Sequence, residues 1–292
     1  MKKTYVLYNP LAGNNHGKEL SKEIKNIAKD RKLIYHDITE IKDYKEFCNN
    51  VIKNADIIIS GGDGTLNRFI NNIEGMELKN NIYYYATGTG NDFLNDIEPK
   101  KENRLYLIND YLCNLPTVTV KEKNYKFLNG IGYGIDGYCC EVGDKLKQKT
   151  TNPVNYTSIA IKGLLFHYHP TNAKICVDGK EYTFNKVWIA ATMNGRFYGG
   201  GMMSAPKQNR LNKENKVSVV IMYGAGKLKT LMAFPSIFKG EHIKYTNMVR
   251  VITGKKVSVE FDKPTALQID GETILNVEKY DVLAENRQLL KN

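Results

Sequence analysis

Within the first 93 residues, short apolar runs alternate with helix-forming stretches, and this order allows few folds. Segments 4–9, 33–38, 56–60 and 82–86 are rich in β-branched and aromatic residues and predict strands. Strands that alternate with helices favour a parallel sheet with crossover helices, in which ligands bind beyond the carboxyl ends of the strands. We therefore predict an N-terminal α/β domain with a Rossmann-like parallel sheet. The helices between its strands are expected around Leu20, Ile24 and Ile27, over Asp43–Lys53, and after residue 65.

After Pro116 the pattern changes to short alternating segments that predict strands. The turn sequences Asp178-Gly179 and Gly254-Lys255-Lys256 fit β-hairpins. Two helical insertions, at about 138–166 and 226–239, interrupt these strands. A block of strands that follows a block of alternating strands and helices indicates a separate, all-β sandwich-like domain.

Length and composition agree with two globular domains. The chain has 292 residues, of which 42% are hydrophobic and 25% are charged, and this excludes disordered, collagen-like and coiled-coil proteins. Domains typically have roughly 100–200 residues, so we expect one domain at 1–116 and another at 117–280. No segment has the ~18 consecutive apolar residues of a membrane span, and the five cysteines lack metal-binding spacings. We expect a cytoplasmic protein.

The net charge of +11 belongs entirely to the second part of the chain. Residues 1–116 carry 16 basic and 16 acidic residues, whereas residues 117–292 carry 26 and 15. A one-sided positive field attracts polyanions such as anionic lipid, nucleic acid or a phosphorylated ligand. The alternative interpretation is a solvated basic face that only aids solubility.

The sequence Gly61-Gly62-Asp63-Gly64-Thr65 lies between a predicted strand and a predicted helix. Glycines let the backbone approach a phosphate closely, and a helix N-terminus offers unpaired N–H groups and a positive dipole end. Because Asp63 would repel a phosphate directly, its presence favours a cation such as Mg²⁺ in the same site. The structural alternative is a tight turn in which Asp63 caps the helix.

A second glycine-rich loop, Gly88-Thr89-Gly90-Asn91-Asp92, also follows a predicted strand. Thr89 can donate to phosphate oxygens, and Asn91 and Asp92 can hold a cation or a hydroxyl group. The alternative is an Asx turn that caps a helix. The loop Asn9–Gly13 follows the first strand, so three loops are expected at one edge of the sheet.

Near the C-terminus, Gln268-Ile269-Asp270-Gly271-Glu272 places two carboxylates around a glycine. In isolation this sequence predicts a hairpin turn. If it faces the loops of the first domain, Glu272 is a carboxylate that could accept a proton from an attacking hydroxyl group. The GxGxxG sequence at 132–137 lacks the acidic residue of a dinucleotide site, and the chain has no P-loop or protein-kinase signature.

These segments together resemble the diacylglycerol kinase and sphingosine kinase family. The resemblance rests on NPLAG at 9–13, GGDGTLN at 61–67, GTGNDF at 88–93, FLNGIGYGIDG at 127–137, NGRFYGGGM at 194–202 and QIDGE at 268–272. It extends over nearly the whole chain and is closest to the bacterial soluble lipid kinases. GGDG alone is less specific, because NAD kinases and phosphofructokinases have similar loops.

The resemblance implies a nucleotide-binding domain, a β-sandwich domain and a return of residues 281–292 to the first domain. It implies ATP and Mg²⁺ as cofactors, Glu272 as the general base, and Asp63 and Asp92 as active-site acids that hold the metal. The positions that match nucleotide-binding residues are Asn9, Pro10, Gly13, Thr39, Gly61, Gly62, Asp63, Gly64, Thr65, Asn67, Gly88, Thr89 and Asn91.

One segment departs from the family pattern. Where the family has an acidic segment that holds a structural Mg²⁺, this chain has Lys213-Glu214-Asn215 and Ser218 after Ala205-Pro206. Most of the expected carboxylates are missing, which argues against a second metal site near Glu214.

The sequence therefore predicts an ATP-dependent lipid kinase that phosphorylates a hydroxyl group of diacylglycerol or a related glycerolipid. Its expected partners are the lipid substrate and the surface of anionic membranes, with peripheral attachment and without nucleic acid, and a homodimer is left open. One alternative is an NAD-kinase-like phosphotransferase with a soluble substrate. Another is a noncatalytic, ATP-responsive regulator that binds membrane or nucleic acid.

Overall fold

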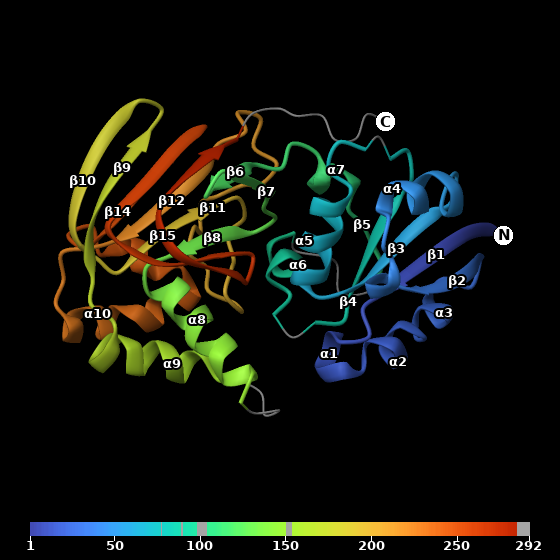
Figure 1. Ribbon diagram of the computed structural model, residues 1–292, viewed down its shortest axis with the longest axis horizontal. Helices are drawn as coiled ribbons and strands as arrows, with labels where there is room; N and C mark the ends of the chain where they lie inside the picture. Colours follow the sequence, from blue (N-terminus) through green and yellow to red (C-terminus); the bar gives the residue numbers. More distant parts are fainter. Residues whose placement is uncertain (77, 89, 98–103, 150–153, 285–292) are drawn as a thin grey trace. The chain divides into compact units, whose positions relative to one another are not determined.

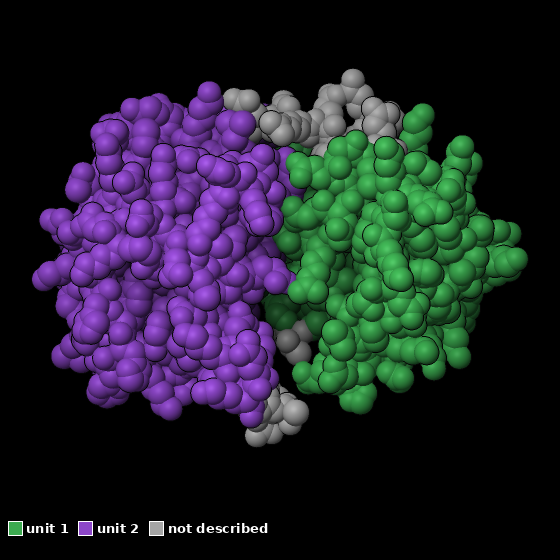
Figure 2. All heavy atoms as spheres, viewed as in Figure 1, with its two compact units in different colours: residues 1–115, 286–292 green, residues 116–285 purple. Residues whose placement is uncertain are grey.

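The computed structural model describes the whole chain except residues 77, 89, 98–103, 150–153 and 285–292. The chain forms two compact units, one containing Met1–Leu115 and the other the described residues from Pro116 onward (Figure 2). No helix in the described part is both long and apolar enough to cross a lipid bilayer.

The first unit is built on a five-stranded sheet (Figure 1). Its elements are β1 (Lys2–Tyr8), α1 (Ala12–Asn15), α2 (Gly17–Ser21), α3 (Ile24–Ile27), β2 (Arg31–Asp37), η1 (Ile38–Glu40), α4 (Tyr44–Glu46), η2 (Phe47–Val51), β3 (Asp56–Gly61), α5 (Asp63–Asn72), β4 (Ile82–Ala86), α6 (Asp92–Asp96), β5 (Tyr106–Leu107) and α7 (Asn109–Leu112). The strand order is β2-β1-β3-β4-β5, and β1 to β4 are parallel. The carboxyl ends of β1, β3 and β4 are therefore neighbours at one edge.

The interior of this unit explains its sequence pattern. Every residue of β3 is buried, as expected for a central parallel strand with covered faces. Val6 and Ile58 pack with Ile24 and Ala28 from the segment that contains α3. The expected long helices are instead broken into short pieces, with a π-helix at η2, and the sequence pattern does not predict the antiparallel edge strand β5.

The second unit consists of antiparallel strands with a layer of helices (Figure 1). Its elements are β6 (Thr117–Val120), β7 (Lys123–Lys126), β8 (Gly130–Tyr133), α8 (Ile135–Lys147), α9 (Tyr156–Lys162), η3 (Gly163–His167), β9 (Thr171–Val177), β10 (Lys180–Val187), β11 (Ile189–Met193), β12 (Val217–Met222), α10 (Lys227–Ala233), η4 (Phe234–Lys239), η5 (Glu241–Lys244), β13 (Val249–Gly254), β14 (Lys256–Ile269) and β15 (Glu272–Leu283). The predicted fold class is confirmed for both units.

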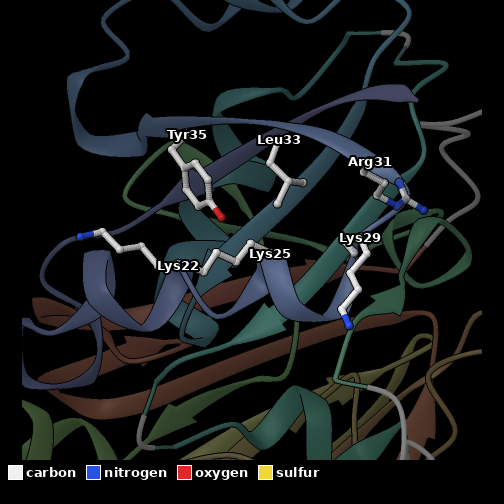
Figure 3. Close-up of a pocket in the computed structure, with 7 residues that line it drawn as sticks. Lys22, Lys25, Lys29, Arg31, Leu33 and Tyr35 are labelled. Carbon is white, nitrogen blue, oxygen red and sulfur yellow. The ribbon is translucent and has the colours of Figure 1, made fainter.

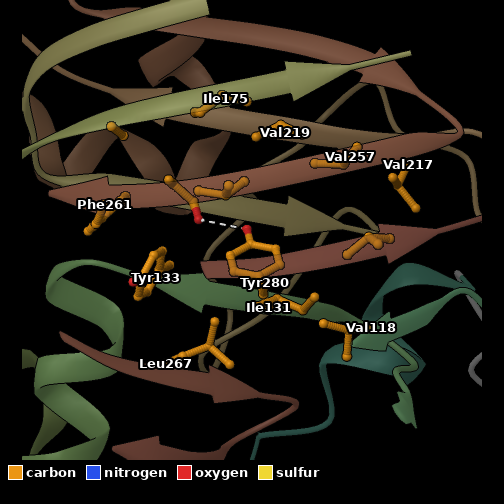
Figure 4. Close-up of a cluster of buried hydrophobic side chains, with 14 of the residues drawn as sticks. Val118, Ile131, Tyr133, Ile175, Val217, Val219, Val257, Phe261, Leu267 and Tyr280 are labelled. Carbon is orange, nitrogen blue, oxygen red and sulfur yellow. Dashed lines mark hydrogen bonds between the residues drawn. The ribbon is translucent and has the colours of Figure 1, made fainter. Parts of the chain in front are cut away.

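A common core joins strands that are distant in sequence (Figure 4). Val118, Ile131, Val257 and Tyr280 all contribute to it, from β6, β8, β14 and β15. The Tyr280 hydroxyl is close to the Thr192 hydroxyl, at 2.9 Å, which pairs a polar group that burial would otherwise leave unsatisfied.

Strand β12 is buried on both faces, which accounts for its continuous apolar sequence. Val219 and Ile221 face the common core, whereas Val220 and Met222 face a second core under the helices. The helices α8, α9 and α10 and the helical turn η4 cover this second core. They correspond to the two predicted helical insertions, although the second insertion changes from an α-helix to a 3-10 helix at Phe234.

The expected hairpin at Gly254–Lys256 is wrong. Strand β13 pairs with β12, and β14 pairs with β8, β9 and β15 instead. Where the chain changes partners, the Asp178 carboxylate, in the turn between β9 and β10, accepts hydrogen bonds from the Lys255 and Lys256 N–H groups. The hairpin at Asp178-Gly179 is confirmed.

Residues 281–283, which were expected to begin the return of the chain to the first unit, instead belong to the second unit. Strand β15 runs to Leu283, and Asp281 to Leu283 pair with β6 of the second unit. The remainder of the predicted return, residues 285–292, lies outside the described residues.

Candidate phosphate-binding loops and carboxylates

Two glycine-rich loops of the first unit lie in direct backbone contact. A Cβ atom built on Gly88 would lie 2.5 Å from the Gly62 Cα, and one built on Gly62 would lie 3.2 Å from the Gly88 Cα. The Thr87 N–H donates to the Gly61 carbonyl at 2.9 Å. Only glycine allows this approach, so the sequence-predicted loops 61–65 and 88–92 are brought together. Thr89 lies outside the described residues.

Asp63 connects these two loops. Its carboxylate accepts a hydrogen bond from the Phe93 N–H at 3.1 Å and one from the Tyr84 hydroxyl at 3.4 Å. Burial, reinforced by the Asp63 charge, raises the pKa of Tyr84 well above its usual value. Tyr84 therefore stays protonated at neutral pH, and its hydroxyl group can donate a hydrogen bond. Asp63 is the first residue of α5, whose N-cap is Gly62, so it does not cap the helix as the structural alternative assumed.

The segment 87–92 contains two polar oxygens that have no hydrogen-bond partner among the described residues. The Thr87 Oγ1 and Asn91 Oδ1 atoms are buried and have no hydrogen-bond partner among the described residues. Asn91 has a φ of 39° and precedes α6, of which the buried Asp92 is the first residue. Buried polar atoms without partners are rare and cost free energy, so these atoms are suited to a ligand.

The loop after β1 adds further polar groups to the same edge. The Asn9 side chain donates to the Thr65 hydroxyl at 2.8 Å and accepts from the Leu11 N–H at 3.0 Å. Pro10 follows it. At Gly13, which has a φ of 57°, a Cβ atom would lie 2.8 Å from the Thr87 carbonyl oxygen, so this position also needs glycine. The three loops are therefore packed together.

Two other predicted positions, Thr39 and Asn67, belong to the same unit. Thr39 is exposed in η1, beyond the carboxyl end of β2, where Asp37 accepts hydrogen bonds from its N–H and hydroxyl groups. Asn67 is buried in α5 and bonds to Asn71 one turn later. Gly64 leaves open space at the start of the same helix.

The loops offer few groups for a metal ion. Among the described residues, no three His, Cys, Asp or Glu side chains are grouped closely enough to hold one. Asp63 and Asp92 nevertheless fit Mg²⁺, because this ion typically binds one or two carboxylates and takes its other ligands from phosphates and water. The unsatisfied Asn91 oxygen is a further hard donor.

In the second unit, Glu272 is the first residue of β15 and is exposed. It follows a two-residue turn in which Asp270 and Gly271 have φ values of 46° and 93°. Positive φ at both positions is characteristic of a type I′ turn, for which Asp-Gly is a favoured sequence. The predicted hairpin is therefore present and holds Glu272 at its end.

Asp270 fastens this hairpin to the loop before β8. Its Oδ1 atom accepts from the Asn129 and Gly130 N–H groups at 2.8 and 2.9 Å, and its Oδ2 atom accepts from the Leu128 N–H. A carboxylate with three backbone donors positions the adjacent Glu272. The sequence pattern predicts only a turn at Asp270 and does not reveal that this carboxylate holds the loop before β8.

We expect Asp270→Asn to lower the free energy of unfolding by about 1–3 kcal/mol, because an amide group can accept only two of these bonds and leaves the Leu128 N–H unsatisfied. Asp178→Asn is the matched control, since Asp178 accepts both of its bonds through one oxygen, which Asn retains. Urea unfolding measures both variants. Equal stabilities would contradict the prediction.

The segment expected to lack a metal site is held by hydrogen bonds between protein groups. Arg210 donates to the Leu128 carbonyl and the Asn129 side chain, both at 3.1 Å. Gln208 accepts from the Ser218 hydroxyl at 2.5 Å. Glu214 is exposed and forms an ion pair with Lys216 at 2.5 Å, which lowers the pKa of the Glu214 carboxyl.

Comparison with known proteins identifies the two units separately. Residues 3–110 match the diacylglycerol kinase catalytic domain, and residues 129–281 match the YegS C-terminal NAD kinase beta sandwich-like domain. The chain belongs to the diacylglycerol kinase family of bacterial lipid kinases. The loops 61–65 and 88–92 lie within the first match, and Glu272 lies within the second.

Individual relatives agree with this family. The chain is 24% identical to "Putative lipid kinase YtlR" of Bacillus subtilis (strain 168), over 92% of both chains. It is 29% identical to "Putative lipid kinase SaurJH9_0749" of Staphylococcus aureus (strain JH9), over 77% of this chain and 73% of the relative. A "putative diacylglycerol kinase" structure from Bacillus anthracis str. Sterne has the same fold, with a TM-score of 0.67 and 18% identity over 97% of this chain and 92% of that one.

A buried carboxyl in this family member lies at the start of α8, in the GxGxxG sequence. Asp136 accepts a hydrogen bond from the Tyr198 hydroxyl. Burial raises its pKa from 3.8 to about 6, although the Tyr198 hydrogen bond opposes this shift. Because the folded state binds the proton more tightly, this carboxyl stabilises the fold at low pH and loses that contribution as the pH rises through about 6.

We expect Asp136→Asn to remove this loss, since an amide does not ionise. Relative to the parent, the variant should gain stability between pH 4 and pH 6 and reach a relative gain of about 3 kcal/mol by pH 7. Denaturant unfolding at pH 4.5 and pH 7 measures the difference. The same stability difference at both pH values would refute this interpretation.

A hollow of about 280 Å³ lies elsewhere on the first unit (Figure 3). It lies between the segment of α2 and α3 and the edge strand β2. Its charged lining residues are all basic: Lys22, Lys25, Lys29 and Arg31. The Arg31 guanidinium is bonded to Asp56 at 2.5 Å. This hollow is separate from the loops 61–65 and 88–92 and was not predicted from the sequence.

Proposed function

We propose that this protein transfers the γ-phosphoryl group of ATP to a hydroxyl group of a membrane lipid, with diacylglycerol or a related glycerolipid as the substrate. The observation that carries the proposal is the bridge made by Asp63, which ties the two glycine-rich loops together through Phe93 and Tyr84. The close approach of Gly62 and Gly88 supports the same proposal, because a backbone free of Cβ atoms can surround phosphate groups.

The loops of the first unit would bind the nucleotide. Backbone N–H groups at the start of α5 face a site favourable to anions, because the helix dipole is positive at that end. Asn9 and Thr65, which are joined by a hydrogen bond, would fix the orientation of the phosphates. Mg²⁺ bound by Asp63 and Asp92 would neutralise charge on the transferred phosphoryl group.

Glu272 would act as the general base. The acceptor hydroxyl oxygen forms a bond to the γ-phosphorus, the bond from that phosphorus to the bridging oxygen of ATP breaks, and ADP leaves. The hydroxyl proton moves to the Glu272 carboxylate. Asp270 acts through Glu272 as a positioning residue, because it fixes the turn from which β15 begins.

The test is incubation of the purified protein with γ-labelled ATP, Mg²⁺ and mixed lipid vesicles, followed by lipid extraction. We expect label in a phosphorylated glycerolipid. Label in NADP⁺ when NAD⁺ is the only acceptor would instead support the NAD-kinase-like alternative. Nucleotide binding without transfer to any acceptor would support the regulator alternative.

A further inference from the structure

The helical layer of the second unit exposes large apolar side chains. Ile161 in α9 is 41% exposed and Phe166 in η3 is 67% exposed. Leu228 and Met232 in α10 are 70% and 74% exposed. Such exposure of four large apolar residues in neighbouring helices is costly in water and marks an interaction surface.

These residues belong to adjacent elements. The Lys227 Nζ atom donates to the Leu165 carbonyl at 3.0 Å, which joins α10 to η3. Figure 1 shows α9 and α10 side by side against the strands of their unit. Leu228 and Met232 are four residues apart and therefore lie on one face of α10. We call Ile161, Phe166, Leu228 and Met232 the insertion face.

The inward side of the same helices is already packed. Ile159 and Leu164 are buried in the second core, as are Ala233 and Phe234. The helices therefore do not need the insertion face to attach to the strands. Among the described residues, the buried members of the second core do not include the four residues of the insertion face.

The charges on the helices that carry the insertion face are positive. Lys162 and Lys229 are exposed in α9 and α10, and Lys239 is exposed at the end of η4, which follows α10. No acidic residue occurs in 145–174 or in 223–240. Apolar side chains with flanking lysines are typical of helices that lie in the interface of an anionic bilayer.

We propose that the insertion face enters the interfacial region of an anionic membrane, with its lysines against the lipid headgroups. Membrane binding by the insertion face is argued from exposure and charge. It rests on the proposed function only in being the surface through which a lipid kinase would reach its substrate. A second copy of the chain is a poorer occupant, since the lysines of the two copies would repel each other.

The test compares the parent with the double variant Phe166→Gln/Met232→Gln by sedimentation with vesicles that contain phosphatidylglycerol. Both side chains are exposed, so the variant should fold normally. We expect vesicle affinity to fall by about tenfold per side chain, and by about 100-fold in total, because each loses apolar burial. The matched control is Leu211→Gln, at an exposed leucine outside these helices, and should bind like the parent.

Two results would overturn the proposal. One is vesicle affinity in the double variant equal to that of the parent. The other is a parent that does not bind anionic vesicles but binds an acidic protein through this face. Phosphorylation of a short-chain diacylglycerol dispersed as monomers does not require membrane binding. This assay therefore tests the proposed lipid-kinase function separately from the insertion face. If the parent binds vesicles through this face but phosphorylates no lipid, the proposed function fails and the insertion face stands.

Discussion

Replacement of Asp63 by Asn is expected to lower turnover by about 10²–10³-fold while the protein remains folded. The amide oxygen can still accept from the Phe93 N–H. The amide nitrogen can donate to the Tyr84 hydroxyl, whose proton can then be directed to the Gly61 carbonyl oxygen, 3.2 Å away in the parent. The substitution therefore keeps the bridge between the loops and removes only the negative charge that a phosphate-bound cation requires.

The measurement is turnover with saturating ATP, Mg²⁺ and lipid, together with urea unfolding. Asp43→Asn is the matched control in the same unit, because Asp43 caps α4 by accepting from the Glu46 N–H, and Asn caps a helix equally well. The control should retain the activity of the parent. A folded Asp63→Asn variant with nearly normal turnover would remove Asp63 from the mechanism.

The architecture of the first unit could be predicted because its signals are local. The apolar run 56–60 is long enough for a buried strand and is bounded by a glycine-rich loop, so its identity does not depend on distant residues. The glycines at 62 and 88 also favour a close approach of the backbone to a neighbouring group, and in the structure each is next to the other. Helix continuity was not predictable in this way, because left-handed residues such as Gly13 and Asn14 interrupt the chain after β1.

The errors and omissions arise from long-range contacts. The sequence at Gly254–Lys256 fits a tight turn, but β13 and β14 gain more partners in other strands than they would by pairing with each other. Tyr84 is 21 residues from Asp63, and Arg210 is 82 residues from Leu128. No local pattern in the sequence connects such pairs. The Asp-Gly sequence at Asp270 predicts a turn locally. It does not show that the Asp270 carboxylate binds the loop at 128–130.

Replacement of Glu272 by Gln should reduce kcat by about 10²–10⁴-fold and leave ATP affinity nearly unchanged. A lipid hydroxyl is a weak nucleophile at neutral pH, so a nearby carboxylate can accept its proton as the bond to phosphorus forms. Gln retains the size of the side chain and a hydrogen-bond acceptor but is not a base. Because Glu272 is exposed and follows a turn fixed by Asp270, its substitution should not disturb the fold.

Single-turnover rates and nucleotide affinity separate this role from a purely structural one. Glu278→Gln is the matched control, since Glu278 is exposed on the same strand β15 and has no role in the proposed mechanism. If Glu272 is only a turn residue, both variants should transfer phosphate at the parent rate. That result would leave Asp63 or Asp92 as the candidate base. A slow Glu272→Gln variant with normal ATP binding and a normal Glu278→Gln control would instead assign proton transfer to the end of this hairpin.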